Sequence, residues 1–331
     1  MQTKLRIGSD ADGARLSKAF SAAVAVILFS LMLFKANDAA VYAKKALYLC
    51  TTSVIPSIFP LMIASSMLAS SGGDILFSRI FGGLISRIFG VSRCSASAVI
   101  PGFLCGFPIG AIAAIRLYES RRITKNELSH LLVFVNNPGA SVVIYTVGAG
   151  MLGSVKLGVL IYLSVIAASA VAGIIARFIL PASASSETHY IESGISFSSL
   201  IVSSVGSAIT GALNVCAYSA FFSAFAGVIC GFLARYGAPF GLRAAISGFF
   251  ELIGGVSVLN ESSSPLFAAL SSAAVCSWSG VSVLMQIASV CRAASDSEKI
   301  SFAPMILSKC FQALLSPLIV LLLLGLTRFD I

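Results

Sequence analysis

The sequence predicts an all-α integral membrane protein with about seven transmembrane helices and two re-entrant helical hairpins in an inverted repeat. Hydrophobic residues make up 57% of the 331 residues and charged residues only 11%, against roughly 25% charged in a soluble domain. Apolar stretches of about 20 residues, the length of a helix that crosses a bilayer, recur along the chain. Glycine and proline interrupt several of these stretches, which predicts hairpins and broken helices among the spans.

The N-terminal part of the chain has three predicted elements. The first apolar run, 19–34, follows a basic head and is predicted to be a retained anchor, with a signal peptide as the alternative. The run 46–70 is predicted to be the second crossing. Residues 74–93 alternate arginine with apolar residues at near-helical spacing, which predicts an amphipathic helix lying in the membrane interface.

The next stretch, 96–115, contains Pro101, Gly102, Gly106, Pro108 and Gly110. Such a concentration of helix breakers predicts a re-entrant hairpin with its tip at residues 102–108. The crossing predicted at 128–147 is broken in its middle by Asn-Asn-Pro-Gly at 136–139. An uninterrupted span follows at 155–180.

The second half of the chain repeats this order. After a polar linker come a long span within 198–234, a Gly-rich hairpin at 242–260, a crossing at 268–290 broken at 277–280, and a last span at 304–326. Three crossings lie between the two hairpins, and because three is odd the second half is inverted relative to the first. Inverted repeats with helices interrupted at matching positions are typical of secondary transporters.

Short sequence matches support the repeat. Gly102-Phe103 corresponds to Gly248-Phe249, and Gly139-x-Ser-Val corresponds to Gly280-x-Ser-Val. Lys and Arg lie in short loops, mostly on the N-terminal side of the predicted spans, which predicts a cytoplasmic N-terminus. They form no basic stripe interleaved with aromatic residues, so nucleic acid is not an expected partner.

The solute site is expected where the hairpin tips and broken helices meet, because unwound backbone in a membrane exposes polar groups. Glu251, flanked by apolar residues, is the candidate for binding a coupling sodium ion or a proton; the alternative is a shallow hairpin whose carboxylate reaches water. The candidate substrate-binding residues are Cys105, Gly106, Phe107, Asn136, Asn137, Ser277, Trp278 and Ser279.

These residues also have structural explanations. Asn136 and Asn137 would tie a helix kink to its neighbours, and Trp278, the only tryptophan, would mark a membrane interface. The eight cysteines form no C-x-x-C pair, so neither a metal site nor a cofactor is expected. Paired carboxylates and a Ser/His arrangement are also missing at predicted membrane depth, so an enzyme is not expected.

Several motifs resemble one family. Pro101-Gly-Phe-Leu-Cys-Gly-Phe-Pro-Ile-Gly110, Phe134-Val-Asn-Asn-Pro-Gly139 and Gly248-Phe-Phe-Glu251 are similar to sporulation integral membrane proteins with the nucleoside-recognition (Gate) domain. The resemblance implies a head and first helix at 1–45, a first Gate-type repeat at 46–180, a linker at 181–197 and a second, inverted repeat at 198–331. It also implies a relation to concentrative nucleoside transporters, whose site is formed by two hairpins and two unwound helices.

The sequence therefore predicts a transporter of a small polar or anionic solute that works by alternating access. The resemblance suggests dipicolinic acid during spore formation, in a multi-pass protein of a bacterial cell or spore membrane. The alternative is a non-transporting membrane scaffold required for spore maturation. The expected partners are a small-molecule solute and the lipid bilayer, and self-association into a homo-oligomer is left open. Substrate, coupling ion, transport direction and cleavage of the first apolar run are not specified by the sequence.

Overall fold

The computed structural model describes residues 2–180, 196–293 and 300–328, without the side chains of residues 2–17, of Asp74 and of Ala293. Residues 181–195 of the predicted linker lie outside this part. The described secondary structure is helical. The first half comprises α1 Gln2–Phe34, α2 Ala36–Leu49, the π-helix η1 Cys50–Val54, α3 Ile55–Ser70, α4 Asp74–Phe89, the 3₁₀-helix η2 Arg93–Ser95, α5 Ala96–Leu104, α6 Ile109–Glu119, α7 Lys125–Phe134, the π-helix η3 Val142–Met151 and α8 Val155–Ile179. The second half comprises α9 Phe197–Arg235, α10 Phe240–Phe250, α11 Leu252–Leu259, α12 Pro265–Trp278, α13 Gly280–Ala293 and α14 Ala303–Thr327.

Five helices are long and apolar enough to cross a membrane, or six if the bent pair Ile75–Phe89 and Arg93–Leu104 counts as one span. This set is smaller than the seven predicted crossings for two reasons. The part of α1 whose side chains are described, Lys18–Phe34, is shorter than these five helices. The crossing predicted at 128–147 is divided into α7 and η3, so neither piece is long enough. The second predicted crossing instead begins earlier, because α2, η1 and α3 form one span over 36–70.

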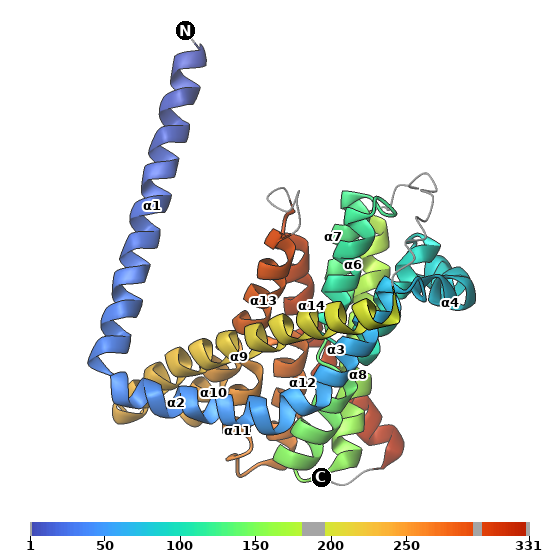
Figure 1. Cartoon of the computed structure of the whole chain (residues 1–331). Helices are drawn as coiled ribbons and strands as arrows, with labels where there is room; N and C mark the ends of the chain where they lie inside the picture. The colour runs from blue at the N-terminus through green and yellow to red at the C-terminus, as the bar shows by residue number, and fades with distance from the viewer. Residues whose placement is uncertain (1, 181–195, 294–299, 329–331) are drawn as a thin grey trace.

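Both predicted hairpins are present as pairs of packed helices. In the first, α5 and α6 pack together around a turn at 105–108, and in the second α10 packs on α11 around Glu251. Figure 1 shows α6 and α7 in the upper part of the molecule and α10 and α11 in the lower part. The two hairpins therefore approach the middle of the molecule from opposite ends.

The helix α4 turns away from the first hairpin, with a bend of 107° between the two segments. Its outer face exposes Leu76, Ile80 and Leu84, each more than half exposed, while Ile85 and Phe89 are buried. An amphipathic helix with one apolar face open and arginines beside it is the pattern of a helix that lies in the membrane interface.

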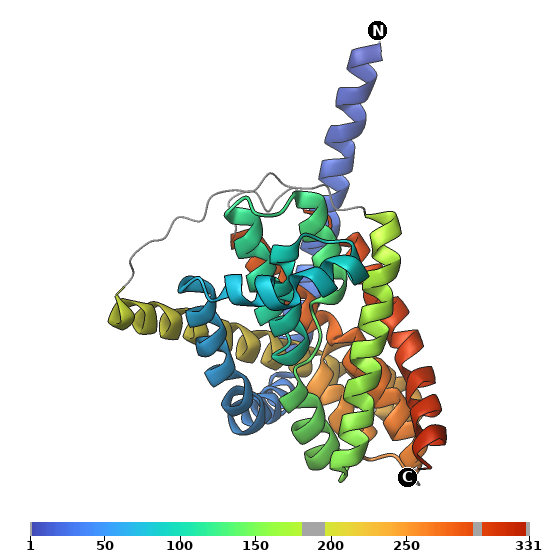
Figure 2. The ribbon, with the colours of Figure 1, turned by 90° about the vertical axis from the view of Figure 1, so that its right-hand side faces the viewer.

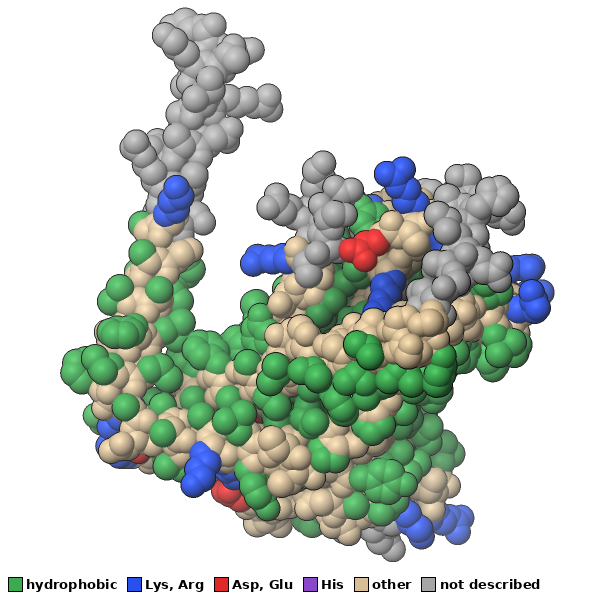
Figure 3. Space-filling model, viewed as in Figure 1, with side chains coloured by type: hydrophobic (Ala, Val, Ile, Leu, Met, Phe, Trp, Pro, Cys, Tyr) green, Lys and Arg blue, Asp and Glu red, His purple; other side chains and the backbone are tan. Residues whose placement is uncertain are grey.

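The outer surface is that of a protein in contact with lipid. Figure 3 shows hydrophobic side chains in a broad band across the visible face, with Lys and Arg mostly toward its upper and lower parts. The exposed hydrophobics include Phe178, Phe197, Leu314 and Leu322. A soluble monomer rarely exposes so continuous an apolar surface, so the side chains agree with the membrane class predicted from composition.

An aromatic cluster fixes the first hairpin to the helices behind it. The rings of Phe89 and Phe134 stack with centroids 4.5 Å apart, and Phe103 meets both rings edge-on. Gly173 on α8 leaves room for this cluster, because a Cβ there would lie 2.8 Å from the Phe134 ring. On the same side of the molecule α8 packs along α14, as Figure 2 shows. The break after α7 therefore stands on a rigid support.

Candidate solute site

The tip of the first hairpin touches the break in the first broken helix. The backbone N–H of Phe107 donates to the carbonyl of Asn137 at 2.7 Å. Gly106 has a φ of +81°, and a Cβ there would lie 2.2 Å from the nitrogen of Gly139. A Cβ on Gly139 would in turn lie 2.4 Å from the carbonyl oxygen of Cys105. Only glycine permits this approach at both positions.

The second hairpin meets the second broken helix in a similar way. Ser279 ends α12 in the left-handed region with a φ of +72°, and Gly280 follows with a φ of +85°. A Cβ on Gly280 would lie 3.1 Å from the Cα of Glu251. The Trp278 indole Nε1–H donates to the carbonyl of Phe249 at 2.8 Å. Each half of the molecule thus joins a hairpin tip to its own broken helix.

A small cavity of about 30 Å³ lies between these two units. Phe107 and Gly139 line it from the first half, and Glu251 and Gln286 line it from the second. Cys50 and Ser219 close it from η1 and α9. A cavity of this size holds one or two water molecules, so a larger solute would require the units to move apart.

Among the described residues that line this cavity, Glu251 alone is acidic, and it is 4% exposed. Its carboxylate accepts the Ser219 hydroxyl at 3.0 Å and the Ser223 hydroxyl at 3.3 Å. It also accepts the backbone N–H of Gly254, as the N-cap of α11. Helix N-termini stabilise negative charge, so serine hydroxyls and a helix end surround this carboxylate. Such surroundings suit a carboxylate that binds a small cation or exchanges a proton.

The side chains of Asn136 and Asn137 turn away from the cavity and complete the end of α7. Asn136 Nδ2 donates to the carbonyl of Leu132 at 2.9 Å, and Asn137 Nδ2 donates to that of Phe134 at 2.8 Å. The last carbonyls of a helix have no partner within it. The two amides therefore satisfy the carbonyls that the break frees, and only the Asn137 backbone carbonyl reaches the hairpin tip. A substrate-binding role for these side chains stays a prediction.

The predicted residues of the second break also lie beside the cavity and not on it. The Trp278 ring stacks on Phe249 with centroids 5.4 Å apart. The Ser279 hydroxyl donates to the carbonyl of Cys276, whereas the buried Ser277 hydroxyl has no partner among the described residues. Of the first tip, Phe107 lines the cavity and Cys105 packs against the same group of side chains.

Sequence reasoning missed three polar residues here. Ser219 bonds to Glu251, and Gln286 lines the cavity with an Oε1 atom that has no partner among the described residues. Lys309 is fully buried on α14, and its Nζ donates to Asn137 Oδ1 at 3.3 Å and to Gln312 Oε1 at 3.2 Å. Two of them could have been found from the sequence, because Gln286 and Lys309 are isolated polar residues inside apolar runs, and such residues in a membrane are usually functional.

The Lys309 ammonium lies at the C-terminal end of α7, which carries partial negative charge. The neighbouring Ser308 hydroxyl and Gln312 amide both donate to the carbonyl of Val133, at 2.9 and 3.0 Å. Together with the two asparagines, these side chains give each of the last three carbonyls of α7 a donor. The break is thus stabilised from α14 as well as from within its own segment.

Trp278→Phe is expected to lower the stability of the protein without changing its backbone fold. Phenylalanine keeps a ring against Phe249 but removes the hydrogen bond to the Phe249 carbonyl. The loss is about 1 kcal/mol, or an apparent unfolding temperature lower by roughly 2–4 °C. Thermal unfolding of the purified protein in detergent checks this. An unchanged unfolding temperature would show that this hydrogen bond does not hold the second hairpin.

A scan against protein-family models found no match, and a search of curated proteins found none either. Solved structures of CNTnw, a concentrative nucleoside transporter, share the fold. A CNTnw variant in the state named intermediate 3 aligns over 90% of this chain and 87% of its own, with 15% identity and a TM-score of 0.53. A CNTnw variant in an outward-facing state aligns over 92% of this chain and 87% of its own, with 16% identity and a TM-score of 0.49.

CNTnw in an inward-facing substrate-bound state aligns over 92% of this chain and 87% of its own, with 15% identity and a TM-score of 0.46. The intermediate 3 structure carries the argument for the fold. At these identities the likeness concerns the fold alone. This chain is therefore a helical, multi-pass membrane protein with the fold of concentrative nucleoside transporter structures.

Proposed function

We propose that the protein is a secondary transporter of a small polar or anionic solute, working by alternating access between its two hairpin units. The observation that carries the proposal is the cavity bounded by both units, with the buried Glu251 on its wall. A transporter of this kind binds its solute between inverted repeats near the bilayer midplane. The fold shared with transporter structures supports the same function.

Glu251 is proposed to carry the coupling cation, either sodium or a proton. A buried carboxylate whose described partners are hydroxyls and a helix end is a suitable site for either ion. We propose that Cys105, Gly106 and Phe107 contact the solute from the first tip. Asn136, Asn137, Ser277, Trp278 and Ser279 are proposed to contribute when the units move apart, because in the structure they lie behind the cavity wall.

The solute is proposed to be dipicolinic acid during spore formation. This rests on the resemblance of the hairpin and break motifs to the sporulation proteins with the Gate domain. The proposed location is a bacterial cell or spore membrane with a cytoplasmic N-terminus. Self-association into a homo-oligomer stays a prediction, as does the division of the chain into a head, two Gate-type repeats and a linker.

The test is uptake of labelled dipicolinate and of labelled nucleosides into liposomes that contain the purified protein, with and without sodium and proton gradients. Gradient-dependent uptake is expected for one solute class in the wild type. In Glu251→Gln the amide keeps the shape of the side chain but cannot hold a cation or release a proton. Uptake driven by the gradient should therefore fall at least about tenfold, which corresponds to about 1.4 kcal/mol.

Glu119→Gln is the matched control, because Glu119 is exposed at the end of α6 and does not line the cavity. It should transport as the wild type does. If neither solute enters with folded wild-type protein under any gradient, the alternative of a membrane scaffold gains weight. If Glu251→Gln transports normally, Glu251 is not the coupling residue.

A further inference from the structure

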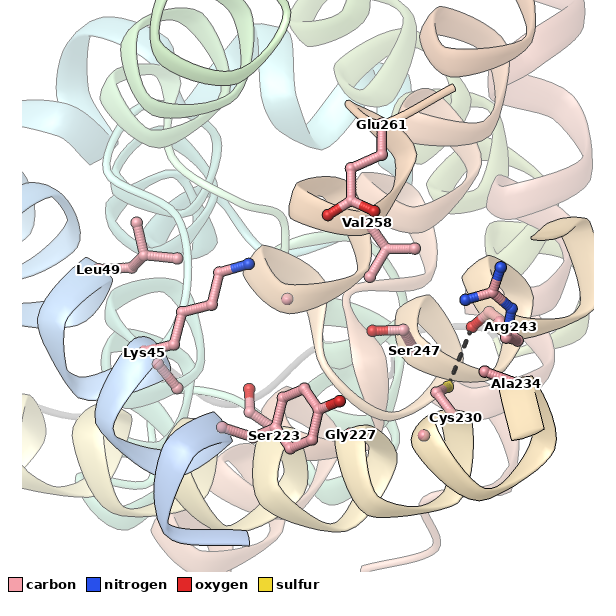
Figure 4. Close-up of a pocket in the computed structure, with 14 residues that line it drawn as sticks. Lys45, Leu49, Ser223, Gly227, Cys230, Ala234, Arg243, Ser247, Val258 and Glu261 are labelled. Atoms are coloured by element: carbon pink, nitrogen blue, oxygen red, sulfur yellow. Dashed lines mark hydrogen bonds between the residues drawn. The ribbon is translucent and has the colours of Figure 1, made fainter. Parts of the chain in front are cut away.

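A second, larger cavity of about 220 Å³ lies on the other side of Glu251, between α2, α9, α10 and the end of α11. Its polar lining consists of Tyr42, Lys45, Ser223, Arg243, Ser247 and Glu261. In Figure 4 the side chains of Lys45 and Glu261 extend into the space between the helices, and Arg243 lies on its opposite side. The cavity is smaller than the 300–1,000 Å³ typical of drug-sized ligands, so it suits a single ring or a short chain.

Two basic side chains and one acidic side chain line this cavity, which leaves one positive charge in excess. The Arg243 guanidinium lies over the Phe240 ring at 5.9 Å from its centroid, which holds it in place. Its Nε atom is buried and has no hydrogen-bond partner among the described residues. A buried polar donor without a partner is costly, and in this cavity it points to a ligand that supplies the acceptor.

The cavity shares a wall with the Glu251 site. Ser223 and Gly254 both line it, and both donate to the Glu251 carboxylate on the other side. A ligand held between Lys45 and Arg243 would thus be separated from Glu251 by a single layer of atoms. A movement of α11 relative to α9 would join the two spaces.

We propose that this cavity is a capture site for solutes that carry a carboxylate, which Arg243 and Lys45 bind before the solute reaches the Glu251 site. The proposal deepens the proposed transport function by naming a second site and a ligand class. Arg243 supplies a planar fork that matches a carboxylate, and Lys45 supplies a second charge. A neutral analogue of the same size has no charge for these two residues to bind.

The experiment is isothermal titration of the detergent-solubilised protein with dipicolinate, and with the neutral pyridine-2,6-dicarboxamide as the matched ligand. Wild type is expected to bind dipicolinate and not the diamide. Arg243→Gln and Lys45→Gln should each weaken dipicolinate binding about tenfold or more, the effect of one charge-assisted hydrogen bond. Lys44→Gln changes the adjacent exposed lysine, which does not line the cavity, and should bind as the wild type does.

Arg243→Lys replaces Arg243→Gln if the latter fails to fold, because lysine keeps the positive charge but lacks the planar guanidinium. Its affinity for dipicolinate should lie between that of wild type and that of Lys45→Gln. Absence of dipicolinate binding to wild type, or equal binding by wild type and both cavity variants, would overturn the proposal. The transport function can fail separately. Binding that depends on Lys45 and Arg243 without any liposome uptake would leave a carboxylate site in a protein that does not transport.

Discussion

Gly106→Ala is expected to destabilise the protein by about 2–5 kcal/mol. The added Cβ would lie 2.2 Å from the nitrogen of Gly139 and 2.6 Å from the carbonyl oxygen of Asn137. Both are backbone atoms, so no side chain can rotate away and the hairpin tip must shift. Overpacking of this kind costs about 1–3 kcal/mol, and the left-handed backbone at Gly106 adds about 1–2 kcal/mol for alanine. The measurement is the apparent unfolding temperature of the purified protein in detergent.

Two other glycines separate the contributions to this loss. Gly153 also has a positive φ, of +69°, but a Cβ there meets no atom within 4 Å, so Gly153→Ala measures the backbone cost alone. Gly206 lies within α9, also in open space, and Gly206→Ala should leave stability unchanged or slightly higher. Equal losses for Gly106→Ala and Gly153→Ala would mean that the hairpin tip does not press on the break.

The same glycines explain how much of the fold could be predicted. Both hairpins and both breaks were found at the expected places, because glycine and proline stop a helix wherever the surrounding fold puts it. The number of crossings was less accurate. Hydropathy counts the stretch 128–147 as one crossing, whereas the structure divides it into α7 and η3, and neither piece is long enough to be a span.

The candidate site was predictable in outline but not in atomic detail. Glu251 was identified because a carboxylate within an apolar hairpin is costly unless it has a function. Asn136 and Asn137 were identified because they lie at the predicted helix break, where unwound backbone exposes polar groups, but a sequence does not show which way an amide points. In the structure they bond to the carbonyls of α7. The partnership of Lys309 with Asn137 joins residues 172 positions apart, and no local pattern encodes such a contact.

Lys309→Met is expected to leave stability nearly unchanged while transport falls at least about tenfold. Methionine removes a buried charge whose desolvation costs several kcal/mol. It also leaves Asn137 Oδ1 and Gln312 Oε1 without this donor, at about 1–3 kcal/mol each. These opposing effects are similar in size. Transport is affected differently, because Lys309 bonds to Asn137 and the Asn137 carbonyl accepts from Phe107, which lines the cavity.

The two readouts distinguish a functional charge from a structural one. Apparent unfolding temperature and liposome uptake are measured on the same preparations of wild type, Lys309→Met and Lys156→Met. Lys156 is exposed at the start of α8, so its replacement should change neither readout. A fall in both readouts together for Lys309→Met would assign Lys309 to holding the break in shape. A fall in uptake alone would mean that the transporter keeps a positive charge at the first broken helix and a negative one at the second hairpin, with both side chains contributed by the second half of the chain.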